Sequence, residues 1–188
     1  DGNSTTDNLQ VDGVSYTFPV GDKTTVIVGD NTDGSALFST ACVYGGPSNT
    51  LDDCGNVNAG ITNGGAMAGA SYDFGTGFTA AVGYAGPEGG IMTEESMDAY
   101  GINAAYTGDN YGVSLTYGVL ETSTTDEDTF TAFNAYYTPE GFPSISVGYE
   151  IGEDGSVTGS ADSLTSIFLG ISWDEVGPGS AGVAYGTK

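Results

Sequence analysis

The sequence predicts an all-β protein built from antiparallel up-and-down hairpins, and three observations support this fold class. Short apolar segments alternate in period two with small or polar residues along most of the chain. Glycine accounts for 32 of the 188 residues, and glycine-containing turns separate the segments. Leucine is scarce and lysine is nearly absent, so long helices are improbable.

The alternating segments predict a single β domain over residues 1–188, with about 10–12 strands. The first two strands are joined by a tight turn at residues 21–23, and the last eight form four hairpins. The expected strands are Val14–Val20, Thr24–Gly29, Ala36–Tyr44, Ala66–Phe74, Phe78–Ala85, Ala99–Tyr106, Tyr111–Leu120, Thr129–Tyr137, Ser144–Ile151, Leu164–Trp173 and Ala181–Gly186.

The connections between the later strands alternate in length. Turns within the hairpins are short, whereas the links between hairpins are long and acidic, at Gly86–Asp98, Glu121–Asp128 and Gly152–Ser163. Short turns at one end and long polar loops at the other are typical of an outer-membrane β-barrel. Strands of about 8 to 10 residues also suit a tilted span across a bilayer.

The two faces of each strand differ in kind. In residues 144–151 the odd positions are Ile, Val, Tyr and Ile, whereas the even positions are Ser, Ser, Gly and Glu. This contrast favours a transmembrane barrel with aliphatic side chains toward lipid and small polar ones toward a lumen. A stacked fibre-like sheet and an acidic secreted sandwich remain the alternatives. Aromatic residues near strand ends are expected to form an interfacial girdle: Tyr72, Phe74, Phe78, Tyr106, Tyr111, Tyr137 and Trp173.

The charge balance excludes some functions. Lys and Arg number 2 and Asp and Glu number 25, which gives a net charge of −23. A nucleic-acid partner is excluded because almost nothing could neutralise phosphates. Clusters of carboxylates on loops are interpreted as solvated surface. Weakly bound Ca²⁺ is the alternative, although no stretch has the spacing of a known calcium loop and no metal ligand set is certain.

Two cysteines indicate the compartment. Cys42 and Cys54 bracket a segment that contains Gly45, Gly46 and Pro47, so the segment is able to bring its ends together. We expect a disulfide that closes the loop 42–54 and indicates an oxidising compartment. Two buried free thiols are the alternative, and no neighbouring base favours a redox-active thiolate.

Two stretches of the chain resemble a known family. The run VDGVSYTFPVGDKTTVIVG (residues 11–29) resembles a strand pair of cyanobacterial outer-membrane porins. GFPSISVGYEIG, followed by SIFLGISWDEVGPGSAGVAYGTK, resembles a late hairpin of the same porins. These are the porins that carry an S-layer-homology domain and are related to carbohydrate-selective porins. The resemblance covers most of Val11–Lys188 and implies a trimeric channel in the cell outer membrane.

The chain also departs from that family. It contains no S-layer-homology region or coiled coil, and it ends in Gly186-Thr187-Lys188 rather than in the aromatic residue typical of outer-membrane barrels. We therefore expect this chain to be part of a larger barrel.

The expected function is passive diffusion of small hydrophilic solutes or ions across the outer membrane, with an acidic pore mouth that favours cations. No catalytic constellation is present, since there is no His and both lysines are poorly placed as bases, so no enzyme is expected. The expected partners are the lipid bilayer and further copies of the chain. The alternative is a secreted acidic β-rich structural protein, namely a fibre, surface-layer or matrix subunit at the cell surface. The pore-mouth residues are expected to be Asp52, Asp53, Glu94, Glu95, Asp126, Glu127 and Asp128 on long loops and Glu150 on a lumen-facing strand position.

Overall fold

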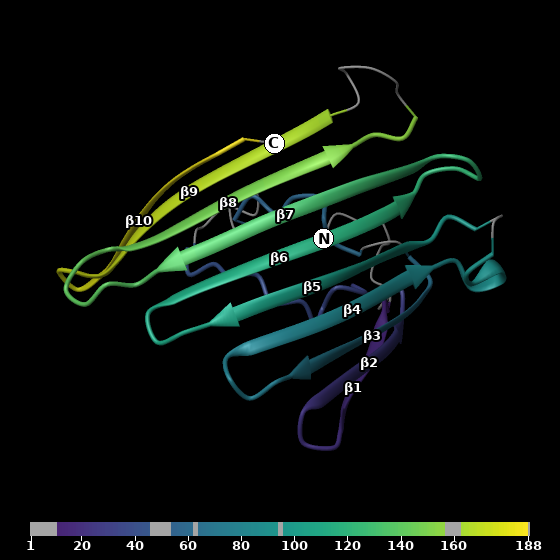
Figure 1. The fold of residues 1–188 in the computed structure, drawn as a ribbon, viewed down its shortest axis with the longest axis horizontal. Helices are drawn as coiled ribbons and strands as arrows, with labels where there is room; N and C mark the ends of the chain where they lie inside the picture. The colour runs from purple at the N-terminus through teal and green to yellow at the C-terminus, as the bar shows by residue number, and fades with distance from the viewer. Residues whose placement is uncertain (1–10, 46–53, 62–63, 94–95, 157–162, 188) are drawn as a thin grey trace, which may run out of the picture.

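The chain folds into one antiparallel sheet of ten strands in which each strand pairs with the next along the sequence (Figure 1). The computed structural model describes residues 11–45, 54–61, 64–93, 96–156 and 163–187. The strands are β1 (Val14–Val20), β2 (Thr24–Asp30), β3 (Ala66–Asp73), β4 (Phe78–Gly86), β5 (Ala99–Thr107), β6 (Tyr111–Glu121), β7 (Glu127–Tyr137), β8 (Ser144–Glu153), β9 (Ser163–Val176) and β10 (Gly179–Gly186). A short 3₁₀ helix, η1 (Glu88–Gly90), follows β4. In the described part of the chain, no helix is long and apolar enough to cross a membrane.

The all-β, antiparallel up-and-down prediction is confirmed, and each of the ten strands lies where the alternation places it. One predicted strand is wrong: Ala36–Tyr44 forms no strand in the structure. Its backbone N–H groups at Ser39, Ala41 and Val43 bind side chains of the sheet instead of a neighbouring strand. Every second residue of this stretch donates to the sheet, as every second residue of a strand donates to one neighbour, so the segment resembles a strand in sequence.

The sheet is open. β1 pairs only with β2 and β10 only with β9, so these two strands are the free edges and the described residues do not close into a barrel. Figure 1 shows the sheet strongly twisted, with the β1–β2 hairpin at one end and β9 and β10 at the other. Right-handed twist accumulates between neighbouring strands and rotates the strand direction steadily across such a sheet.

The connections lie at opposite ends of the strands, as their lengths predict. The hairpin turns at residues 21–23, 74–77, 108–110, 138–143 and 177–178 share one end, here called the turn end. The links at residues 31–65, 87–98, 122–126 and 154–162 share the other, here called the loop end. The link between β6 and β7 is shorter than expected, because Glu127 and Asp128 already belong to β7.

Candidate membrane-facing surface and inner face

The outer face of the sheet exposes a continuous apolar surface. Alternate residues of β5 to β8 are exposed, and the residues between them are buried on the other face. Cross-strand register places Leu115 beside Phe133 and Val147 beside Leu169. The central residues of this surface are 37% to 66% exposed: Val82, Ile102, Leu115, Phe133, Val147, Leu169 and Val183.

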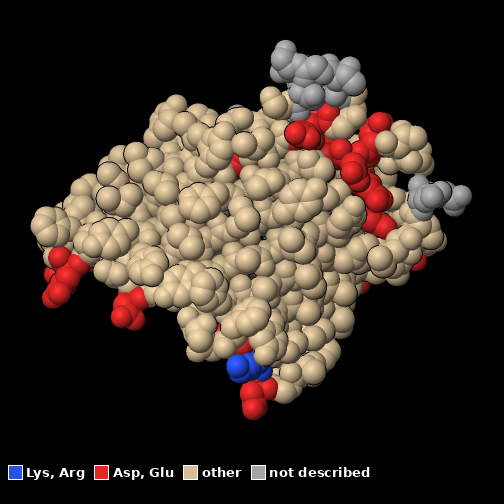
Figure 2. Space-filling model, in the orientation of Figure 1, with Lys and Arg blue, Asp and Glu red and all other residues tan. Residues whose placement is uncertain are grey.

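Charged residues are almost absent from this face. On β4 to β10, every acidic residue except Glu150 lies within two positions of a strand end, and these strands contain no Lys or Arg. Figure 2 shows the resulting uncharged surface, with carboxylates gathered at the loop end of β6 to β8 and smaller groups of charges at the turn end. A face this apolar and this exposed is unusual for a protein surrounded by water.

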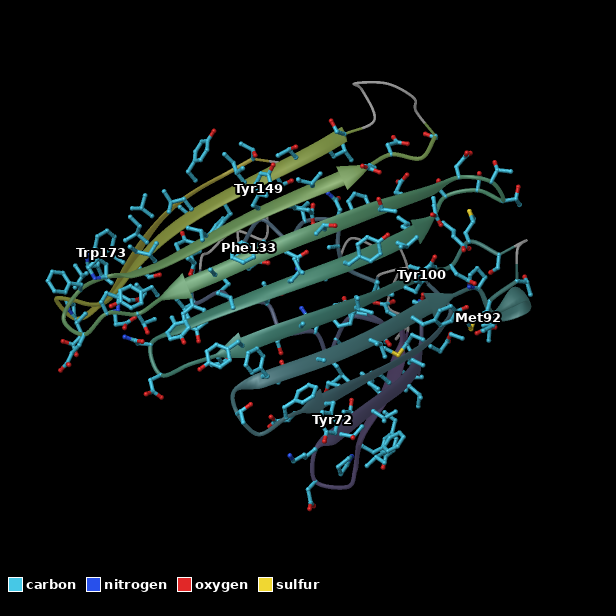
Figure 3. The ribbon with its side chains drawn as sticks, in the orientation of Figure 1. Tyr72, Met92, Tyr100, Phe133, Tyr149 and Trp173 are labelled. Atoms are coloured by element: carbon cyan, nitrogen blue, oxygen red, sulfur yellow. A yellow bond between two sulfur atoms is a disulfide. The ribbon has the colours of Figure 1, made fainter. Side chains whose placement is uncertain are left out.

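Aromatic side chains line the turn end of the outer face. Phe78 and Tyr106 pack with ring centroids 4.7 Å apart, and Tyr106 lies 5.6 Å from Tyr111. Tyr72 and Phe74 form a second contact at 4.8 Å. Figure 3 shows Tyr72 and Trp173 at this end, whereas Tyr100 lies toward the loop end and Phe133 and Tyr149 lie between them. All seven aromatic residues of the predicted girdle are at the turn end, namely Tyr72, Phe74, Phe78, Tyr106, Tyr111, Tyr137 and Trp173.

The inner face is covered by the chain between β2 and β3. We call its described residues, 31–45 and 54–61, the inner segment. The segment lies close against glycines of the sheet: a Cβ at Gly148 would overlap the carbonyl oxygen of Cys54, and one at Gly83 would overlap the carbonyl oxygen of Gly34. The glycines on this face therefore make room for the backbone of the inner segment.

Polar side chains on three strands hold the first half of the inner segment. Asn103 on β5 accepts a hydrogen bond from Ser39 N at 2.8 Å, and its Nδ2 donates to Ser39 O at 3.1 Å. Ser114 on β6 accepts from Ala41 N at 2.8 Å, and Ser146 on β8 accepts from Val43 N at 3.1 Å. These bonds satisfy backbone donors that would otherwise be buried without partners.

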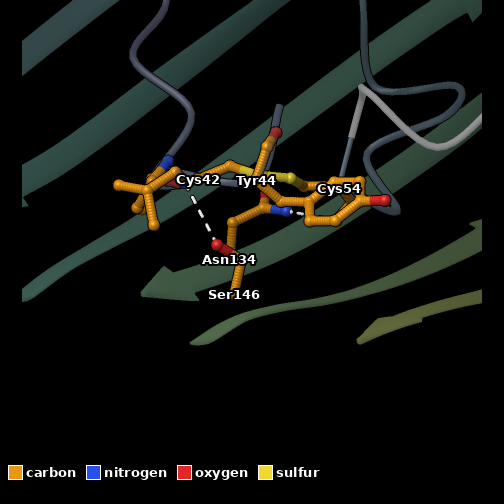
Figure 4. The surroundings of a disulfide bond; sticks show 8 residues. Cys42, Tyr44, Cys54, Asn134 and Ser146 are labelled. Atoms are coloured by element: carbon orange, nitrogen blue, oxygen red, sulfur yellow. Dashed lines mark hydrogen bonds between the residues drawn. A yellow bond between two sulfur atoms is a disulfide. The ribbon is translucent and has the colours of Figure 1, made fainter. Parts of the chain in front are cut away.

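A disulfide joins the two halves of the inner segment. Cys42 and Cys54 are bonded, with their Cα atoms 6.3 Å apart, as the sequence predicts. Asn134 on β7 donates from Nδ2 to Cys54 O at 2.7 Å (Figure 4). Tyr44 packs edge-on against Phe168 of β9, with ring centroids 5.6 Å apart. The disulfide thus lies over β7 to β9, far along the sheet from the strands that the segment connects.

Glu150 is buried beneath the inner segment. Only 1% of its surface is exposed. It lies on the face of β8 that the sequence predicts to line a lumen. Its carboxylate accepts hydrogen bonds from Asn58 N at 2.9 Å, Ala59 N at 3.0 Å and Asn58 Nδ2 at 2.8 Å. The structure therefore places Glu150 in a buried contact between sheet and segment, whereas the sequence analysis expected it to line the pore mouth.

The other predicted pore-mouth residues separate into two groups. Asp126 caps its own loop by accepting a hydrogen bond from Ser123 Oγ at 2.8 Å, and Asp128 accepts one from Gly155 N at 3.0 Å. Glu127 faces Glu121 across the β6–β7 ladder, so these carboxylates gather at the loop end. The remaining four predicted residues, Asp52, Asp53, Glu94 and Glu95, lie outside the described residues.

No group of three or more His, Cys, Asp or Glu side chains is placed to hold a metal ion in the described ranges. Calcium binding by the loops therefore stays a prediction of the sequence.

The sequence analysis missed the contact between the inner segment and the sheet. Two signals for it were present. Asn103 and Glu150 interrupt strand faces that otherwise carry small residues. The connection between two adjacent strands, β2 and β3, also runs from residue 31 to residue 65, which is far longer than a hairpin requires.

We expect removal of the disulfide to weaken the protein substantially. The double substitution Cys42→Ala with Cys54→Ala should lower the free energy of unfolding by about 3 kcal/mol, because the cross-link restricts a short loop in the unfolded chain. Urea titration in detergent measures this loss. Mass spectrometry after alkylation without reductant should show no alkyl group on the wild-type chain, and alkylation of both thiols would contradict the pairing.

No protein-family model matches the chain, and a search of curated proteins found no match.

Proposed function

We propose that the chain forms part of the wall of an outer-membrane β-barrel channel that lets small hydrophilic solutes or ions diffuse across, with a preference for cations. The observation that carries this proposal is the outer face of the sheet, which is apolar, exposed and uncharged between its two ends. Lipid-facing strands of outer-membrane barrels have this pattern, with aromatic residues where the strand ends meet the interface.

The strand lengths support the same proposal. A strand that crosses a bilayer at a tilt of about 45° needs about 9–11 residues. β4 and β5 have 9 residues, β8 has 10, and β6 and β7 have 11. The disulfide agrees with a location outside the reducing cytosol.

The proposal requires partners for the free edges. Unpaired N–H and C=O groups are costly in hydrocarbon, so a sheet in a bilayer must have its edges paired. In the membrane, β1 and β10 would pair with each other or with strands from outside residues 1–188. We also propose a homo-oligomer, and the porins that the chain resembles favour a trimer. Mass photometry in detergent measures the number of copies.

The proposed cation preference follows from the charge. The chain has a net charge of −23, and its described carboxylates are concentrated at the loop end. A pore mouth with this excess of carboxylates attracts cations and repels anions.

Planar bilayers test the cation preference. In a KCl gradient, wild-type channels should show a reversal potential whose sign indicates that K⁺ passes more readily than Cl⁻. This cation preference should fall between 0.1 M and 1 M salt, because the Debye length shrinks from about 10 Å to about 3 Å. The triple substitution Asp126→Asn, Glu127→Gln and Asp128→Asn should reduce the selectivity. It should change stability by no more than about 1 kcal/mol, because Asn keeps an acceptor oxygen for Ser123 Oγ and Gly155 N. Anion selectivity of the wild type would contradict the proposed role of these residues.

One observation favours the alternative, a secreted structural protein. The two free edges, β1 and β10, are able to add strands from further copies, which would build a fibre or surface layer. Two measurements separate the functions. A membrane barrel migrates differently in SDS gels before and after boiling, whereas a structural subunit forms filaments or sheets visible by negative stain without detergent.

A further inference from the structure

The inner segment is fixed to the sheet mainly by hydrogen bonds to its backbone. Side chains from β5 to β8 bind main-chain groups of residues 39, 41, 43, 54, 58 and 59. On a membrane-spanning sheet whose outer face contacts lipid, the covered inner face is the side on which solutes would pass. The segment therefore occupies space that an empty channel would leave to water.

Two apolar clusters also anchor the inner segment. At the β2–β5 side, Ile61 is fully buried and packs in a cluster with Ile27 and Met67, joined by Leu37 and Phe38. At the β8–β9 side, Tyr44 and Cys54 form a cluster with Phe168. Between these two anchors, residues 58 and 59 depend on Glu150 for their hydrogen bonds.

Glu150 is an unusual residue type for a fully buried position. Within the described residues, its hydrogen-bond partners are two backbone amides and one side-chain amide, and all three are neutral. Lys23, the lysine within the described residues, donates to Phe74 O at the turn end instead. A carboxylate buried without a basic partner carries a desolvation cost that its hydrogen bonds must offset. Because it accepts three donors in a converging geometry, it fixes residues 58 and 59 in position.

We propose that the inner segment is the constriction of the channel and that Glu150 is the positioning residue that sets its width. This inference rests on the proposed channel function. Glu150 acts on the size of the solutes that pass, by holding residues 58 and 59 against β8, while the loop-end carboxylates act on their charge.

The test compares Glu150→Ala, Glu150→Gln and a matched control, Glu175→Gln, which changes an exposed carboxylate at the turn end of β9. Entry of neutral sugars of increasing size into proteoliposomes is the readout, because uncharged solutes do not respond to the lost charge itself. Glu150→Ala should raise the rate for a disaccharide at least threefold, Glu150→Gln should give a smaller increase, and the control should match the wild type.

The outcomes separate this inference from the channel proposal. If the wild type inserts and conducts but both Glu150 variants retain the wild-type size limit, the constriction assignment is wrong and the channel proposal stands. If no variant conducts, the channel proposal itself fails. Hydrogen exchange of residues 54–61 then still tests the positioning role, since Glu150→Ala should speed exchange there at least tenfold, and unchanged exchange would refute it. Glu150→Gln keeps a hydrogen-bond acceptor and provides a folded variant if Glu150→Ala does not fold.

Discussion

A single arginine at the centre of the outer face, in the variant Leu115→Arg, is expected to lower the free energy of unfolding in lipid vesicles by about 2–4 kcal/mol. Leu115 is 51% exposed and lies between Ala104 and Phe133 in the cross-strand register. An arginine there would have to place its charge in hydrocarbon. Urea titration in phosphatidylcholine vesicles, followed by the fluorescence of Trp173, measures the loss.

The same substitution distinguishes lipid from water as the surroundings of this face. Exposed sites in water tolerate most changes within about 0.5 kcal/mol. Thr124→Arg, in the exposed link between β6 and β7, is the matched control and should have little effect in vesicles. If Leu115→Arg is equally well tolerated, the outer face contacts water and the secreted structural protein becomes the better explanation.

The second large effect is expected from Gly148→Val on β8, which should destabilise the protein by about 3–5 kcal/mol. A Cβ at this position would overlap the carbonyl oxygen of Cys54 and would lie 2.9 Å from Asn134 Nδ2. The valine would displace the disulfide end of the inner segment and break the hydrogen bond from Asn134 to Cys54. The buried amide of Asn134 would then lack its partner, which adds to the cost of overpacking.

Urea titration in detergent measures the effect of Gly148→Val, and Gly179→Val is the control. A Cβ at Gly179, in β10, would meet nothing within 4 Å, so the control should retain wild-type stability within about 0.5 kcal/mol. Wild-type stability of Gly148→Val would show that the inner segment does not contact β8 as described.

Alternation in the sequence predicts the strands because each strand has two chemically different faces. In β8 the odd residues from Ile145 to Ile151 are exposed and apolar, while the even residues are small or polar and covered. The same signal fails at Ala36–Tyr44. A period-two sequence pattern indicates an extended backbone in which successive N–H groups point to opposite sides. The pattern does not specify which groups accept hydrogen bonds from these N–H groups. Here the acceptors include Asn103, Ser114 and Ser146, which are distant in sequence, so a local pattern contains no information about them.

For the inner face, the sequence predicted the type of residue but not the segment that covers it. Small and polar residues on one side of the strands indicated a lumen, and they do lie opposite the apolar face. Their close contact with the inner segment could not be predicted, because glycine makes room equally well for water and for another backbone. For the same reason Glu150 was grouped with solvent-exposed carboxylates, whereas tertiary contacts bury it.

The long connection between β2 and β3 also has a consequence for the order of folding. Each strand of this meander pairs with its sequence neighbour, so the sheet can grow by successive local steps. The inner segment cannot dock in this way, because its hydrogen-bond partners lie on strands from β5 to β8, which are synthesised later. Closing residues 31–65 into a loop is also entropically unfavourable until those contacts form. The β1–β2 hairpin, although nearest the N-terminus, should therefore be the last part to join the sheet.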